Sequence, residues 1–239
     1  MKAPAKVMGL IGGTSWESTA LYYRHINQIT QERYGGHHSA ECVLYSLDFE
    51  PLLVAAEAGR WQEVADALSD AGRRLAAAGA GFFLLTANTA HRVAEEVQSA
   101  VGLPLLHIGQ ATGQALRRDG LQRVGLIGTR YVTEDGMYAD WLRRHFNIEV
   151  VSPEASDREL LHGIILDELT RGLVRESSRQ AVEAVIQRMR DRGLEGVVVG
   201  CTELPLLLER ACSLALPCYD TTRLHAAAAV DMAAALDGP

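Results

Sequence analysis

Two segments of this chain are repeated in its second half. Residues 6–13 read KVMGLIGG and residues 123–129 read RVGLIGT, while residues 81–91 read GFFLLTANTAH and residues 196–205 read GVVVGCTELP. The two pairs are separated by nearly the same length of chain, and each later segment precedes a short apolar run that begins with proline, at Pro104 and Pro217. Such a duplication within 239 residues predicts two similar lobes rather than one domain.

Short apolar runs alternate with segments of helical periodicity along both copies. We expect strands at 7–11, 41–47, 82–85, 104–108, 124–127, 148–151, 197–199 and 217–219. Continuous apolar runs are typical of parallel strands buried on both faces. The sequence therefore predicts an α/β fold with two pseudo-symmetric lobes, each a parallel sheet flanked by helices, and an active site in the cleft between them. We place the first lobe at 1–113 and the second at 114–212, with 213–239 crossing back to complete the first.

The first expected strand is followed by a glycine turn and a helix start. Thr14 and Glu17 form a T-x-x-E capping box, which opens a helix that runs to about Gln31. The turn lacks the G-x-G-x-x-G spacing of a dinucleotide site.

Charge and hydropathy exclude several partners. The formal charge of −7 and the absence of a Lys/Arg cluster argue against a nucleic acid or an anionic membrane surface. The chain has no apolar run of 18 residues and no charged leader followed by an apolar stretch, so we expect no spanning segment, no secretory signal and a cytoplasmic location.

Cysteine and lysine usage bears on cofactors. The four cysteines have no CxxC spacing and no nearby histidine pair, so we expect free thiols and no zinc site. We interpret Cys42, Cys212 and Cys218 as small buried hydrophobes. Lysine occurs only at Lys2 and Lys6, which leaves no plausible Schiff-base residue for pyridoxal phosphate. We expect neither a metal nor an organic cofactor.

Polar residues cluster at the carboxyl ends of the expected strands, where ligands of parallel sheets bind. Cys201 follows a buried strand and precedes a helix start, so a partial positive field there would favour the thiolate. This makes Cys201 a candidate base or nucleophile that Thr202 and Glu203 could orient, with Glu203 as a proton shuttle; a packed residue after a strand is the alternative. The other strand-end residues could cradle a carboxylate or simply cap helices: Thr14, Ser15, Asn88, Thr89 and Thr129. His91, His107 and His162 have no partner at metal-ligand spacing, which favours structural roles.

At four segments the chain resembles the aspartate/glutamate racemase superfamily of cofactor-independent racemases. The matching segments are GLIGGTSWESTALYYRHIN at 9–27, NTAH at 88–91, GTR at 128–130 and VGCTELPLL at 199–207. The resemblance implies two pseudo-symmetric α/β lobes and a two-base mechanism, in which paired cysteines on opposite faces of the substrate exchange the α-proton. Cys201 matches the second cysteine, which acts as acid/base on the face of the L-enantiomer.

The chain departs from this family pattern at two places. The first cysteine normally stands directly before the Asn-Thr pair, where this chain has Ala87, and we assign the role of a weak partner to Thr86, one residue earlier. Many aspartate racemases also carry a proline-rich segment with an arginine after the second strand, whereas this chain reads LDFE at 47–50. Arg171 could bind the side-chain carboxylate instead, or it could be a solvated charge at a helix end.

The sequence therefore predicts a racemase or epimerase of amino acids that is independent of pyridoxal phosphate, with aspartate and glutamate as the expected substrates and Cys201 and Thr86 as catalytic residues. The expected substrate contacts are Thr14, Ser15, Ala87, Asn88, Thr89, Thr129, Arg171, Thr202 and Glu203. The expected partners are a small amino or dicarboxylic acid and a second copy of the chain in a homodimer. Two alternatives stay open: a one-cysteine decarboxylase of the arylmalonate type, which fits Ala87, and a catalytically silent amino-acid binding protein.

Overall fold

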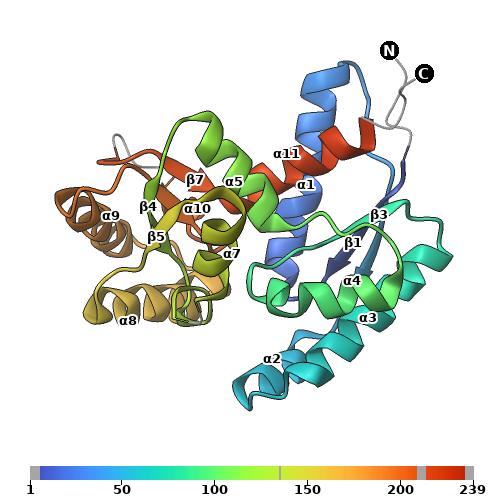
Figure 1. The fold of residues 1–239 in the computed structure, drawn as a ribbon, viewed down its shortest axis with the longest axis horizontal. Coiled ribbons are helices and arrows are strands. Elements are labelled where there is room, and N and C mark those ends of the chain that lie inside the picture. The colour runs from blue at the N-terminus through green and yellow to red at the C-terminus, as the bar shows by residue number, and fades with distance from the viewer. Residues whose placement is uncertain (1–5, 135, 209–213, 235–239) are drawn as a thin grey trace. The chain divides into compact units, whose positions relative to one another are not determined.

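The computed structural model describes residues 6–134, 136–208 and 214–234. The chain divides into two compact units (Figure 1). The first unit comprises Met1–Ile108 and His225–Pro239, and the second comprises Gly109–Leu224. Each unit is built on its own parallel sheet, so the expected α/β class is confirmed.

The sheet of the first unit has the strand order β2-β1-β3. Its strands are β1 (Met8–Gly12), β2 (Cys42–Ser46) and β3 (Phe82–Leu85). An isolated parallel bridge between Phe83 and Leu105 extends the sheet beyond β3. The helices of this unit are α1 (Trp16–Tyr34), α2 (Phe49–Glu57), α3 (Trp61–Ala77), the 3-10 helix η1 (Thr89–Val93), α4 (Ala94–Val101) and most of α11 (Thr221–Ala234).

Both faces of this sheet are covered at β1 and β3, which explains why these two strands are buried along their whole length. Because side chains alternate along a strand, Leu10 and Leu84 pack with α1 and α11, whereas Ile11 and Leu85 pack with α3 and α4 (Figure 1). These four side chains are at most 1% exposed. The sheet is thus fixed from both sides, and its carboxyl edge is left to carry polar residues.

The sheet of the second unit has the order β5-β4-β6-β7. Its strands are β4 (Arg123–Ile127), β5 (Glu149–Val151), β6 (Val197–Val199) and β7 (Cys218–Asp220). Its helices are α5 (Ile108–Arg118), α6 (Arg130–Thr133), α7 (Met137–Phe146), α8 (Ala155–Gly163), α9 (Glu176–Asp191) and α10 (Pro205–Leu208). After α8 the chain continues as a π-helix, η2 (Ile164–Glu168), and a 3-10 turn, η3 (Leu169–Arg171).

The two sheets have the same topology. β1, β2 and β3 correspond to β4, β5 and β6, and the bridging residue Leu105 corresponds to β7. The helix that follows each last strand belongs to the other unit, since α5 packs in the second unit and α11 from His225 onward in the first. We expected all of 213–239 to complete the first lobe; instead β7 pairs with β6, and only the helix after it crosses over. The parallel pairing of β7 with the buried strand β6 explains this division.

Several local expectations needed revision. The N-cap of α1 is Ser15 rather than Thr14, because the Ser15 hydroxyl accepts a hydrogen bond from the Ser18 N–H at 3.2 Å. The helix α2 was not expected, although Asp48 caps it and accepts from the Glu50 N–H at 3.4 Å. The stretch at 47–50 that replaces the family's proline-rich segment is thus the start of this helix.

Two glycines allow close approaches that a side chain would prevent. Gly13 has φ = +89°, and a Cβ atom there would lie 2.1 Å from the carbonyl oxygen of Leu47. Gly113 on α5 faces the ring of Phe146 on α7, where a Cβ atom would lie 2.3 Å from that ring. The first glycine shapes the turn at the end of β1, and the second lets α5 pack closely on α7.

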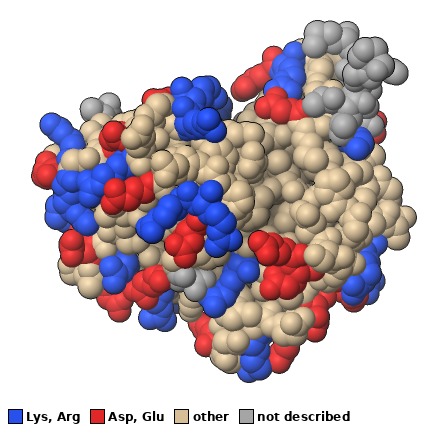
Figure 2. Space-filling view, in the orientation of Figure 1, with Lys and Arg blue, Asp and Glu red and all other residues tan. Residues whose placement is uncertain are grey.

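Positive and negative side chains are interspersed on the face in view (Figure 2). Among the residues that the structure describes, no helix has the length and apolar character needed to cross a membrane.

Candidate active site

Cys201 lies two residues beyond the carboxyl end of β6 and is 6% exposed. Its thiol donates a hydrogen bond to Oε2 of Glu203 over 3.1 Å. The Thr202 hydroxyl donates to the same oxygen at 2.7 Å. All three side chains are buried, so the carboxylate of Glu203 holds both neighbours in fixed positions. The structure thus places together the three residues that the sequence singled out in this segment.

The pKa of the Cys201 thiol is raised well above its usual value. Burial is the main cause and the negative charge of Glu203 adds to it, while hydrogen bonds from the backbone of Glu203 and Leu204 act in the opposite direction. The expected field of the backbone N–H groups is therefore present, but burial outweighs it. In this arrangement Cys201 is a neutral thiol, and the expectation that its surroundings favour the thiolate is wrong.

Two further hydroxyl groups lie at the carboxyl edge of the second sheet. Thr129 follows β4 and is partly exposed. Thr222 follows β7, which runs beside β6, and is 1% exposed; its Oγ1 atom has no hydrogen-bond partner among the described residues. Because a buried hydroxyl without a partner is costly, Thr222 is a candidate ligand contact. Sequence reasoning missed it, although Asp220-Thr221-Thr222 at the end of an apolar strand follows the same pattern as the other candidates.

Thr86, at the end of β3, is held by hydrogen bonds to neighbouring residues of the first unit. Its side chain is fully buried, and its Oγ1 atom lies 3.2 Å from both the carbonyl oxygen of Ile11 and the Oγ1 atom of Thr19. The Ser18 hydroxyl donates to the carbonyl oxygen of Thr86 at 2.6 Å. The single hydroxyl proton of Thr86 is thus engaged within the protein, which argues against the predicted catalytic role.

The other candidates of the first unit follow β1 and β3. Ala87 and Thr89 are partly exposed, and Asn88 is buried. Thr14 has a buried Oγ1 atom without a partner among the described residues, whereas Ser15 serves as the N-cap of α1. The Oγ1 atom of Thr14 is thus available to a ligand.

Arg171 is unsuited to the carboxylate role that the sequence suggested. It ends the 3-10 turn η3, its side chain is 68% exposed, and its guanidinium group lies 4.0 Å from Asp167 one turn earlier. Arg171 is thus a solvated charge at a helix end, the alternative role that the sequence allows.

The other candidate cysteines and histidines that the structure describes are partly or fully buried. Cys42 and Cys218 are free and partly buried, and Cys212 lies outside the described residues. His162 lies against Tyr131, with 5.9 Å between the ring centroids. His91 and His107 lie together, with 4.7 Å between their rings.

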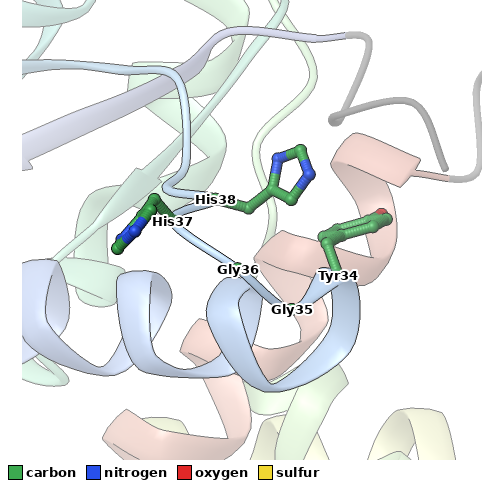
Figure 3. A pocket seen from close by; sticks show the side chains of 5 residues that line it. All are labelled: Tyr34, Gly35, Gly36, His37 and His38. Carbon is green, nitrogen blue, oxygen red and sulfur yellow. The ribbon is translucent and has the colours of Figure 1, made fainter.

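A surface hollow lies at the end of α1, away from these strand ends. It is lined by Tyr34, Gly35, Gly36, His37 and His38 (Figure 3). The ring of His37 points away from those of His38 and Tyr34 (Figure 3). Within the described part of the chain, no three His, Cys, Asp or Glu side chains gather in a way that could hold a metal ion.

Comparison with known proteins identifies a family for most of the chain. The family model of the Asp/Glu/Hydantoin racemases matches residues 11–229, which include every candidate residue and all strands except the first three residues of β1. The chain belongs to this racemase family. The predicted superfamily is thereby confirmed. The carboxyl ends of the strands of both sheets fall within the matched segment.

Two solved structures and one curated protein are similar to this chain in sequence, and the two structures also in fold. A Yersinia pestis protein classed among the Asp/Glu racemases is 44% identical, with a TM-score of 0.89 over 95% of this chain and 99% of that one. An aspartate racemase homologue from Pyrococcus horikoshii OT3 is 30% identical, with a TM-score of 0.85 over the same shares of the two chains. The broad specificity amino-acid racemase RacX of Bacillus subtilis (strain 168) is 25% identical over 140 residues, which are 57% of this chain and 60% of that protein.

Proposed function

We propose that this protein is a racemase or epimerase of amino acids that works without pyridoxal phosphate, that aspartate and glutamate are its substrates, and that Cys201 is its main acid/base. The observation that carries the proposal is the hydrogen bond of 3.1 Å from the Cys201 thiol to Glu203 at the end of β6. A thiol with a carboxylate acceptor in contact can lose its proton when substrate binds.

The proposed chemistry begins with transfer of the thiol proton from Cys201 to Glu203. The thiolate then removes the α-proton of the amino acid, and the electron pair of the C–H bond stays on the substrate as a carbanion delocalised into the α-carboxylate. Because burial and Glu203 raise the pKa of Cys201, its thiolate is rare but strongly basic, which suits a weakly acidic C–H bond. Return of the proton from Cys201 regenerates the same enantiomer. A proton from water or another weak donor on the opposite face completes the inversion instead, and Glu203 then releases its proton to the solvent, which restores the Cys201 thiol and the Glu203 carboxylate.

The position of lysine supports a mechanism without a Schiff base. Lys6 precedes β1 at the amino end of the first sheet, and its side chain passes close to Gly81. Ligands of parallel sheets bind at the opposite, carboxyl ends of the strands. Lys6 is the one lysine within the described residues, and Lys2 lies outside them.

Hydroxyl groups and backbone N–H groups would bind the substrate carboxylates. We assign this role to the strand-end residues Thr14, Ser15, Ala87, Asn88, Thr89, Thr129, Thr202 and Glu203 as predicted, and add Thr222. A carboxylate at either strand end would give the buried Oγ1 atom there, that of Thr14 or that of Thr222, the partner that it lacks among the described residues.

The first unit offers no ionisable group at the family's first-cysteine position. Ala87 stands directly before Asn88, and the Thr86 hydroxyl is engaged by Ile11 and Thr19. The opposite face would then be protonated by water or another weak donor, so inversion would be slow. Ala87 also favours a second candidate function, a one-cysteine decarboxylase in which Cys201 only protonates a carbanion.

The deciding experiment follows the α-proton and the configuration of the same sample. L-aspartate or L-glutamate is incubated with the protein in D2O, deuterium at Cα is measured by NMR, and chirality is measured by chiral chromatography. We expect exchange to outrun inversion, and both to vanish in Cys201→Ala. Exchange that persists in Cys201→Ala would identify another base. No exchange, with release of CO2 from an arylmalonate, would establish the decarboxylase instead.

Cofactor independence and assembly have separate tests. Activity should survive dialysis against a chelator and treatment with a carbonyl-trapping reagent, and a pyridoxal-like absorbance band required for turnover would contradict the mechanism. We also propose that the protein forms a homodimer. The exposed side chains of Trp16 and Tyr23 on α1, 68% and 52% accessible, are suited to a protein contact. Light scattering at micromolar concentration tests the dimer directly.

A further inference from the structure

His91 is a buried histidine whose two ring nitrogens both have partners. It lies on η1 and is 3% exposed. Nδ1 lies 2.9 Å from the carbonyl oxygen of Ala87, and Nε2 lies 3.1 Å from the backbone nitrogen of Ile108. A carbonyl oxygen only accepts and a backbone N–H only donates. The proton of His91 is therefore on Nδ1, and Nε2 carries a lone pair.

The surroundings of His91 keep this ring neutral. It packs against His107 and His225, with ring centroids at 4.7 Å and 5.7 Å. Burial is the main cause that lowers its pKa to about 3, and charge on His225 would lower it further. His225 is itself bonded to Tyr22 and to the carbonyl oxygen of Leu106. His91 is thus held as a neutral donor to Ala87 rather than as an acid.

The acceptor of this hydrogen bond is a peptide group of the candidate site. The carbonyl of Ala87 and the N–H of Asn88 belong to one planar unit, so fixing the first fixes the direction of the second. The preceding carbonyl, that of Thr86, is held by the Ser18 hydroxyl at 2.6 Å. Side chains therefore fix the peptide groups on both sides of Ala87. The other end of the imidazole is tied to Ile108, where α5 begins.

We propose that His91 is a positioning residue of the racemase site: its neutral Nδ1–H fixes the peptide group between Ala87 and Asn88 and so the donors that this strand end offers to substrate. The inference rests on the proposed function insofar as Asn88 binds substrate. Small displacements of positioned groups are costly, since a shift of about 1 Å can reduce turnover on the order of 100-fold.

Two conservative variants of His91 test whether its hydrogen bond to Ala87 matters or only the space that its side chain fills. In His91→Asn, the amide nitrogen occupies the place of Nδ1 and can still donate to Ala87. In His91→Gln, the amide oxygen occupies the place of Nε2 and can still accept from Ile108, but the bond to Ala87 is lost. We expect the kcat for deuterium exchange into L-aspartate to stay within about threefold of the wild-type value in His91→Asn and to fall about tenfold to 100-fold in His91→Gln. Equal losses in both variants, or no loss in His91→Gln, would overturn the proposal.

A measurement independent of activity tests the same hydrogen bonds. Nitrogen-15 NMR of the wild-type imidazoles should show one histidine with a protonated Nδ1 and a bare Nε2, unchanged between pH 5 and pH 8 and absent in His91→Asn. The backbone N–H signal of Asn88 should shift more in His91→Gln than in His91→Asn. A protonated Nε2 in His91 would refute the inference whatever the catalytic result. If the NMR pattern holds and no amino acid exchanges its α-proton, the hydrogen bonding of His91 stands, but the proposed function and the role in it fail.

Discussion

The hydroxyl group of Tyr22 lies 2.9 Å from Nδ1 of His225, and both side chains are fully buried. Since Nε2 of His225 donates to the carbonyl oxygen of Leu106 at 2.8 Å, Nδ1 of the neutral ring must accept from the tyrosine. The second unit has an equivalent bond, from Tyr138 on α7 to Thr112 on α5 at 2.7 Å. In both cases the partner is the fifth residue of the helix that follows the last strand. The duplication thus preserves a hydrogen bond although its acceptor has changed.

Removal of the Tyr22 hydroxyl should destabilise the first unit. In Tyr22→Phe, Nδ1 of His225 stays buried and loses its donor, which costs about 1–3 kcal/mol of unfolding free energy. Tyr23→Phe is the matched control, because the side chain of Tyr23 is 52% exposed on the same helix and should change stability by less than about 0.5 kcal/mol. Urea unfolding followed by circular dichroism measures both. Equal effects of the two substitutions would show that the bond contributes nothing.

The buried histidines predict a loss of stability in mild acid. Burial lowers the pKa of His91 and of His225 to about 3 in the folded protein, from the usual 6.5. Between these values the unfolded chain binds more protons, so their contribution is complete above about pH 6.5 and declines as pH falls toward 3. The slope for each histidine is at most about 1.4 kcal/mol per pH unit.

Unfolding free energies at pH 7, 6, 5 and 4 test this dependence. Carboxylates also contribute to acid unfolding, so the informative quantity is the difference between the wild type and His91→Gln. The variant should have the shallower slope. Parallel curves for the two proteins would contradict the neutral state of His91.

The sequence predicted the parts of this molecule that depend on local pattern. The strands at 82–85, 124–127 and 197–199 were found within one residue, because continuous apolar runs determine them. The strand after Pro217 was predicted, but its pairing with β6 in the second unit was missed, since strand pairing is a tertiary property that a three-residue segment does not encode. Thr86 was chosen from its chemistry alone; its engagement by Ile11 and Thr19 depends on residues far away in the sequence. The raised pKa of Cys201 was missed for the same reason, because burial is set by the packing around it.

The contact between Cys201 and Glu203 predicts how the thiol reacts. Glu203→Gln keeps an oxygen acceptor but removes the negative charge that helps to raise the pKa of Cys201. The thiolate should therefore form at lower pH, and alkylation of Cys201 by iodoacetamide near pH 8 should be faster than in the wild type. Peptide mass spectrometry distinguishes Cys201 from the other cysteines. Glu195→Gln, an exposed change in the same unit, should leave the rate unchanged, and an unaltered rate in Glu203→Gln would show that the charge does not act on the thiol.

Neighbouring threonines at the end of β7 form a matched pair. The Thr221 hydroxyl donates to the carbonyl oxygen of Val199 at 2.9 Å, whereas Oγ1 of Thr222 has no partner among the described residues. Thr221→Val should cost about 1 kcal/mol of stability, and Thr222→Val almost none. If Thr222 binds a substrate carboxylate, Thr222→Val should raise the KM for L-aspartate about tenfold, the equivalent of about 1.4 kcal/mol. A stability loss in Thr222→Val with an unchanged KM would assign the hydroxyl to the fold.

Ala87 stands after β3 at the position where the family pattern has its first cysteine. Ala87→Cys should supply a second thiol directly before Asn88, and inversion of aspartate, from D to L in particular, should rise by about 100-fold or more, as a matched acid/base provides. Thr86→Cys is the control, because Thr86 is fully buried and its hydroxyl is bonded to Ile11 and Thr19. That variant should gain no activity and should lose stability. A gain at Thr86 alone would move the catalytic position by one residue, since adjacent residues of a strand point in opposite directions. No gain at either position, together with decarboxylation of an arylmalonate, would favour the one-cysteine enzyme.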